Sequence, residues 1–127
     1  MAAPNIVNVT TITPNTVSIT PSDTSRNALV AAPSSGTAYK INQIMVSNID
    51  GTNAVNATVE LRLADGTTYR AIGSTISVPA NATLVMLDKT TMLYLVDTSV
   101  TGQASTLWAT SGTASKLTFT CSYEAIS

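Results

Sequence analysis

Two stretches of the chain alternate strictly between apolar and polar residues, and this pattern constrains the fold more than any other feature. From Val55 to Leu63, and again from Leu117 to Glu124, odd-numbered residues are apolar and even-numbered residues are polar. Successive side chains of a strand point to opposite faces of a sheet, so a period of two indicates strands with one buried face. Leu117 and Phe119 are expected in the core, since full burial of a large apolar side chain contributes about 1.5–3 kcal/mol.

The composition also indicates an all-β protein. Ser and Thr make up more than a quarter of the 127 residues, and only 10% are charged, compared with about a quarter in average soluble proteins. Thr, Val and Ile suit the pleated surface of a sheet, and a surface with few charges suits a subunit packed against its neighbours. The sequence therefore predicts a single β-sandwich or jelly-roll-like domain of about eight antiparallel strands with an extended N-terminal arm.

The expected centre of this domain is a hairpin over Tyr39–Leu63. The apolar run Ile44–Val46 is followed by Asp50-Gly51-Thr52-Asn53, a typical turn sequence, and then by the alternating strand. A second tight turn at Asp65-Gly66 should return the chain antiparallel along Tyr69–Ile72. Further strands are expected at residues 75–78, 83–87, 92–96, 100–110 and 117–124.

Residues 1–35 differ from the rest, and the predicted division is an extended arm at 1–35 and a sandwich at 36–127. Pro14 and Pro21 interrupt the short apolar pieces of this segment, which fits edge strands or an extended arm. Two alternatives are open: the arm adds strands to a neighbouring subunit, or it folds back onto its own sheet. The residues expected to contact other subunits are Ile6, Val7, Val9, Val17, Ile19 and Trp108.

Catalytic chemistry is not expected from this sequence. Histidine is absent, and Cys121 is the single cysteine, so His-dependent triads and iron–sulfur clusters are excluded. Cys121 lies in an alternating strand and should be a small buried hydrophobe. Turn formation explains Asp50, Asp65 and Asp97 better than a glycosidase-like carboxylate pair does. Calcium bound by Asp50 and Asn53 would have only two side-chain ligands, so we predict no catalytic residue, cofactor or metal site.

Nucleic-acid and membrane partners are not expected either. The six basic residues are scattered among seven acidic ones, whereas nucleic-acid binding needs clustered Lys and Arg. No segment approaches the roughly 20 apolar residues that span a bilayer. The first residues do not follow a signal-peptide pattern, so the protein is expected to be made in the cytoplasm.

Three segments together resemble a known group of proteins. The segments AYKINQIMVSNIDGTNA, STISVPANATLVMLDKTTMLYLVDTS and LTFTCSYEAIS look like the small virion structural proteins of tailed bacteriophages, notably those that infect cyanobacteria. The resemblance covers about residues 37–127. It departs from the family pattern at Val96-Asp97-Thr98-Ser99, where relatives usually have an acidic-Gly turn.

This resemblance implies a non-enzymatic protein of the virion, made in the host bacterial cytoplasm. The favoured role is a capsid decoration (cement) subunit whose partners are itself, as a trimer, and the major capsid protein or other virion proteins. A neck, collar or tail-attached structural protein is the alternative. A further alternative from another class is a carbohydrate-binding module for host-surface recognition, with aromatic residues such as Trp108 stacking on sugar rings.

Overall fold

The computed structural model describes residues 11–91 and 93–127, and this part of the chain is all-β, with no helix that could cross a membrane. The predicted all-β sandwich is confirmed. The strands are β1 (Ile12–Ile19), β2 (Asn27–Val30), β3 (Ala38–Asn48), β4 (Val55–Leu63), β5 (Tyr69–Val78), β6 (Thr83–Leu87), β7 (Leu93–Leu95), β8 (Ala104–Ser111) and β9 (Leu117–Ile126).

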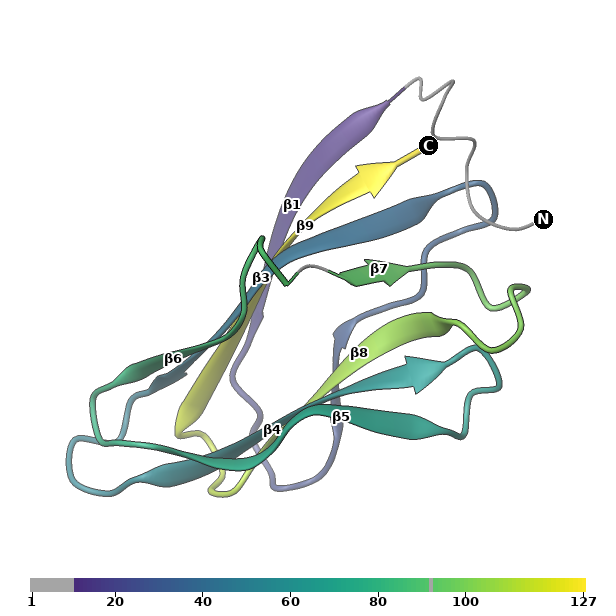
Figure 1. Ribbon diagram of the computed structural model, residues 1–127. Helices are drawn as coiled ribbons and strands as arrows, with labels where there is room; N and C mark the ends of the chain where they lie inside the picture. Colours follow the sequence, from purple (N-terminus) through teal and green to yellow (C-terminus); the bar gives the residue numbers. More distant parts are fainter. Residues whose placement is uncertain (1–10, 92) are drawn as a thin grey trace.

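Two antiparallel sheets form the two layers of the sandwich (Figure 1). The five-stranded sheet has the order β1-β9-β3-β6, with β7 also paired to β3, and the four-stranded sheet has the order β2-β8-β4-β5. The chain stays in one sheet only from β4 to β5 and from β6 to β7, and it changes sheet at every other connection. This wrapping, with the first and last strands paired, is the jelly-roll topology.

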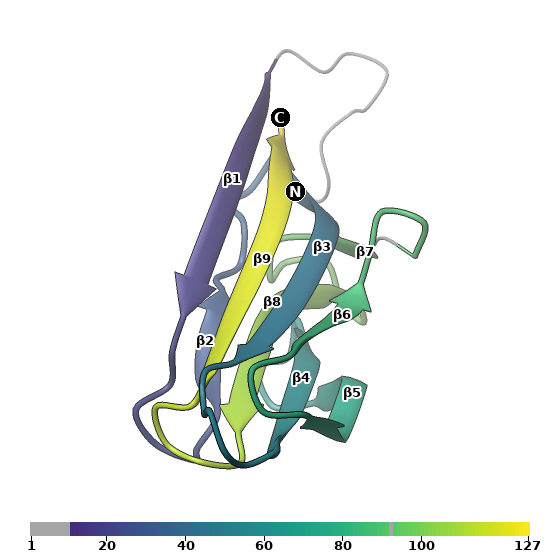
Figure 2. The same ribbon diagram turned by 90° about the vertical axis from the view of Figure 1, so that its left-hand side faces the viewer.

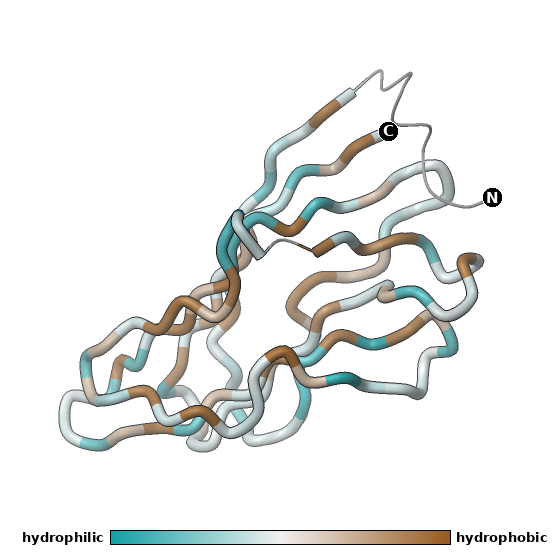
Figure 3. Tube along the Cα trace, viewed as in Figure 1, coloured by the Kyte–Doolittle hydropathy of each residue, from teal (hydrophilic) through white to brown (hydrophobic). Residues whose placement is uncertain are grey.

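The core fills the space between the inner faces of the two sheets. Figure 3 shows hydrophobic residues alternating with paler or hydrophilic ones along the strands. Leu117, Phe119 and Cys121 are fully buried, as the alternation predicts. Burial raises the pKa of the Cys121 thiol to about 12, which fits a packing role. Other fully buried side chains are Ile41, Ile44, Val46, Val59, Val78, Leu95 and Leu107.

The predicted hairpin over Tyr39–Leu63 is wrong, because β3 and β4 lie in different sheets. β3 pairs with β9, β6 and β7, whereas β4 pairs with β5 and β8. The connection at residues 49–54 therefore crosses from one layer to the other. The inward residues of β4 are those that the alternation indicates, since Val55, Ala57 and Val59 are buried. Alternation specifies which face meets the core, but it does not specify the neighbouring strand.

A buried asparagine organises this crossing. Asn48 ends β3 and is 3% exposed. Its Nδ2 donates to the carbonyl oxygens of Val78 and Asn53, both at 2.9 Å, and its Oδ1 accepts from the Asp50 N–H at 2.8 Å. Asp50 Oδ1 in turn accepts from the N–H groups of Thr52 and Asn53. One side chain thus satisfies three backbone groups where the chain leaves the sheet.

The second predicted turn is confirmed. β4 and β5 form an antiparallel hairpin with Arg62 opposite Tyr69. Gly66 lies at the tip with φ of 76°, a conformation that glycine adopts without steric cost. Asp65 Oδ1 accepts from the N–H groups of Thr67 and Thr68, each at 2.9 Å, which explains why this sequence forms a tight turn.

From residue 12 onward, the predicted arm belongs to the sandwich itself. β1 pairs along its whole length with β9, from Ile12 opposite Ile126 to Ile19 opposite Phe119, and β2 pairs with β8. Of the two alternatives for these residues, the structure therefore shows the one in which the segment folds back onto the sheets of its own subunit. Position 35 therefore does not separate two units. A contact between residues 1–10 and a neighbouring subunit stays a prediction.

Candidate interaction surfaces

The residues predicted to contact other subunits are not brought together. Val17 and Ile19 lie on the inner side of β1, are half-buried and pack against the core, so they serve the subunit's own fold and not a free arm. Ile6, Val7 and Val9 lie outside the described residues. Trp108 lies on the outer face of the four-stranded sheet, on β8.

Trp108 belongs to a cluster of aromatic and charged side chains, which we name the Trp108 cluster. The Trp108 and Tyr69 rings meet edge to face, with centroids 6.0 Å apart. The Arg62 guanidinium lies 4.9 Å from the Trp108 ring centroid, and that of Arg26 lies 3.8 Å from the Tyr69 centroid. Arg26 also makes a bidentate ion pair with Glu60, in which Nε donates to Oε1 at 2.8 Å and Nη2 donates to Oε2 at 3.2 Å.

The Trp108 cluster leaves little open aromatic surface on which a sugar ring could stack. A sugar ring would need an open aromatic face, and guanidinium groups already lie over both rings. Trp108 Nε1 donates to Thr106 Oγ1 at 3.0 Å, and Trp108 is half-buried. The cluster connects Arg26, which directly precedes β2, with β4, β5 and β8 on the outer side of the sheet. This favours a structural role over carbohydrate recognition.

The aspartates of the described residues are used in turns. Asp23, Asp50, Asp65, Asp88 and Asp97 each accept hydrogen bonds from residues two or three positions further along the chain. Hydroxyl, backbone N–H or side-chain amide donors lower the pKa of these carboxyls, whereas a general acid needs a raised pKa. No group of three His, Cys, Asp or Glu residues that could hold a metal occurs in the described ranges.

The hydrogen bonds in these turns predict that the stability of the protein falls at acidic pH. The Thr68 hydroxyl, followed by the N–H groups of Thr67 and Thr68, lowers the pKa of Asp65 to about 2, compared with about 3.9 in an unfolded chain. The unfolded state binds more protons between these values, so this contribution is present above about pH 4 and is lost as the pH falls towards 2.

With no histidine in the sequence, the midpoint of thermal unfolding should change little between about pH 5 and 8. Circular dichroism melts from pH 2 to 8 test this, with Asp65→Asn expected to show a shallower acid loss than the unchanged protein. A midpoint that is constant down to pH 2, or a transition centred near pH 6, would contradict the assignment.

The outer face of the five-stranded sheet carries rows of hydroxyl groups. Figure 2 views this face directly, with no other described strand in front of it. Neighbouring hydroxyls contact each other across the strands, as in the pairs Thr20–Thr118 at 2.9 Å and Ser47–Thr83 at 3.0 Å. We name this surface the hydroxyl face, and its members are Thr16, Ser18, Thr20, Ser47, Thr83, Thr118, Thr120 and Ser122.

The hydroxyl face is almost free of charge. Lys40 and Glu124 are the charged residues among the five strands of this sheet, and they neutralise each other, with Lys40 Nζ 3.8 Å from Glu124 Oε1. Met45 and Val85 form an apolar pair beside Thr120, and Val85 is 49% exposed. A neutral face with hydroxyl and methyl groups offers no electrostatic attraction to charged partners.

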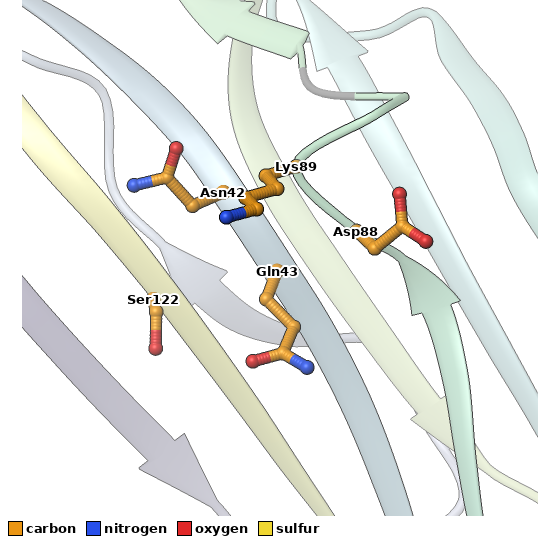
Figure 4. Close-up of a pocket in the computed structure, with 5 residues that line it drawn as sticks. All are labelled: Asn42, Gln43, Asp88, Lys89 and Ser122. Carbon is orange, nitrogen blue, oxygen red and sulfur yellow. The ribbon is translucent and has the colours of Figure 1, made fainter.

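A pocket of about 340 Å³, lined by polar residues, opens between β3, β9 and the loop after β6. Asn42 lies at a register shift in β3, next to the place where the chain leaves the sheet between β6 and β7. Figure 4 shows the Lys89 side chain extending from the loop towards β3 and the Asp88 carboxylate pointing away. With Gln43 and Ser122 completing the lining, amides, an ammonium and a hydroxyl supply hydrogen bonds but no nucleophile–base pair.

The edges of both sheets are interrupted. β1 contains Pro14, which lacks an N–H donor, and β2 is four residues long. β5 has two register shifts and holds Thr75 at φ of 52°, and the opposite edge of the five-stranded sheet is broken between β6 and β7. Such features block edge-to-edge pairing with another chain, so contacts with other subunits should use the faces or the loops.

Comparisons with known proteins give distant structural matches only. No family model and no curated protein sequence matches the chain. The VP2 protein of infectious bursal disease virus, in derived T=1 particles, is 15% identical with a TM-score of 0.42, over 93% of this chain and 32% of that one. This chain therefore spans about a third of the VP2 chain.

Two further solved structures match at similar distance. The virus-like particle of extra small virus from the giant freshwater prawn Macrobrachium rosenbergii is 13% identical with a TM-score of 0.48, over 96% of this chain and 85% of that one. The IMPa metallopeptidase in complex with T-antigen is 13% identical with a TM-score of 0.37, over 91% of this chain and 12% of that one. At these scores the matches carry no information on function.

Proposed function

We propose that this protein is a non-enzymatic structural subunit of a bacteriophage virion, and that it decorates the capsid as a cement subunit. The observation that carries the proposal is the neutral hydroxyl face, which no other described strand covers, on a sandwich whose four sheet edges are interrupted. A surface of this kind suits contact with other protein subunits. The jelly roll itself is common in viral capsid proteins, although lectin domains also use it.

A cement subunit acts by adding buried interface across the junctions between shell proteins. Stable, specific contacts generally bury at least about 1,000 Å² in total. Here the interrupted edges restrict such contacts to faces, loops and residues 1–10. We propose that Ile6, Val7 and Val9 attach the subunit to the shell, while the rigid sandwich spans to the next subunit.

Imaging of the particle tests this role. Cryo-electron microscopy of virions carrying a tagged copy of the protein should place the tag at repeated positions on the head. A tag at the neck, collar or tail would show instead that the protein is a structural component of that part of the virion. Absence of the protein from purified virions would contradict the proposal altogether.

A further inference from the structure

We infer that the hydroxyl face is a self-recognition surface that binds the hydroxyl face of a second copy of this chain. This inference rests on the proposed role as an assembly subunit and names the contact that would be used. The two outer faces of the sandwich differ in a way that points to one of them. The strands of the four-stranded sheet carry Glu60, Arg62 and Arg70, whereas those of the five-stranded sheet carry one neutralised ion pair.

Charge and hydrogen bonding both favour a second copy as the occupant. Two identical faces that each carry net charge would repel each other. The hydroxyl face avoids this because Lys40 and Glu124 cancel, and the loop after β6 adds one residue of each sign, Asp88 and Lys89. A hydroxyl both donates and accepts, so a surface built from hydroxyls is complementary to itself. Most of these side chains contact one another at 2.9–3.5 Å and keep further hydrogen-bonding capacity.

The area of the face is sufficient for a stable contact. The 8 to 11 residues of each of β1, β9 and β3, together with the 5 residues of β6, give a face of roughly 540 Å², from about 3.3 Å per residue and 4.8 Å per strand. Two such faces together bury on the order of 1,100 Å², which reaches the lower range of specific interfaces. Met45 and Val85 supply an apolar centre, and the polar pocket beside Asn42 supplies hydrogen-bonding groups, as interfaces require.

The contact has a defined symmetry. Twisted sheets stack with their strands inclined by about 30°, and a face that binds its own copy does so about a twofold axis. Thr120 lies near the middle of the face, between Ser18 on β1 and Met45 on β3. The inferred unit is therefore a twofold dimer, in contrast to the trimer that the resemblance implies.

Matched substitutions on the two outer faces test the inference. Thr120→Arg brings two guanidinium groups together at the centre of the contact, whereas Thr110→Arg changes an equally half-buried threonine on the four-stranded sheet. Light scattering over a range of concentrations should show a dimer for the unchanged protein and for Thr110→Arg. Thr120→Arg should be monomeric, with dimerisation weakened by about a hundredfold or more.

Two additions keep the test decisive. Ser18 is exposed in β1, so Ser18→Arg tests the same face if Thr120→Arg does not fold, and it should also dissociate the dimer. An equimolar mixture of Thr120→Arg and Thr120→Glu should recover the dimer, since only contact between the same faces places these charges together. A monomeric unchanged protein, or a dimer unaffected by Thr120→Arg and Ser18→Arg, would overturn the inference without affecting virion attachment, which imaging tests separately.

Discussion

A chain lacking residues 1–35 should fail to fold, whereas a chain lacking only residues 1–10 should fold like the full protein. The longer deletion removes β1 and β2, and with them Leu29 and Val30, which are 5% and 3% exposed. Full burial of each such side chain contributes about 1.5–3 kcal/mol, and a domain of this size is stable by only about 5–15 kcal/mol. Loss of β1 also uncovers β9, which carries Phe119 and Cys121.

The shorter deletion leaves every described strand intact and serves as the control. Circular dichroism and thermal melts should show cooperative unfolding for the 1–10 deletion and no transition for the 1–35 deletion. Cooperative unfolding of the 1–35 deletion at the midpoint of the full protein would mean that β1 and β2 are dispensable. If residues 1–10 attach the subunit to the shell, the folded 1–10 deletion should no longer join particles.

Substitution of Asn48 should cause the second large loss. Asn48→Ala leaves the carbonyl groups of Val78 and Asn53 and the N–H of Asp50 without their partner at a buried position. Each buried polar group without a partner costs about 1–3 kcal/mol. Allowing for water that reaches the more exposed loop, the free energy of unfolding should fall by about 2–4 kcal/mol, as measured by urea titration.

Two other variants test whether the loss comes from the Asn48 hydrogen bonds or from the replacement of any asparagine. Asn56→Ala changes an exposed asparagine on β4 and should alter the free energy of unfolding by less than about 0.5 kcal/mol. Asn48→Asp keeps the acceptor for the Asp50 N–H but loses both donated hydrogen bonds, so it should also be strongly destabilised. Equal stability of Asn48→Ala and Asn56→Ala would show that the Asn48 contacts do not hold the crossing between the sheets.

Local features of the fold could be predicted from the sequence. Alternation identified the inward residues of β4 and β9, and the Asp65-Gly66 pair identified the β4–β5 hairpin, because each depends on residues close together in the chain. The pairing of β3 could not be predicted in the same way. A short turn at Asp50–Asn53 is compatible with a hairpin and with a crossing between layers, and the decisive contact from Asn48 to Val78 spans 30 residues.

The candidate surfaces were less predictable than the strands. The Trp108 cluster depends on Arg26 and Glu60, which are 34 residues apart, and no local pattern brings them together. The hydroxyl face requires the order β1-β9-β3-β6. The one usable signal was the scarcity of charged residues in 12–19, 38–48 and 117–126. These segments form one nearly uncharged surface only because they lie side by side in the sheet.

If this subunit stabilises a virus particle through added contacts, the particle should resist heat better when the protein is bound. Particles that lack the protein are compared with the same particles after addition of the purified protein, and the temperature at which they release their DNA is measured. Added protein should raise this temperature until all sites are filled, whereas the 1–10 deletion should leave it unchanged. An unchanged release temperature, with the protein bound, would contradict a cement role.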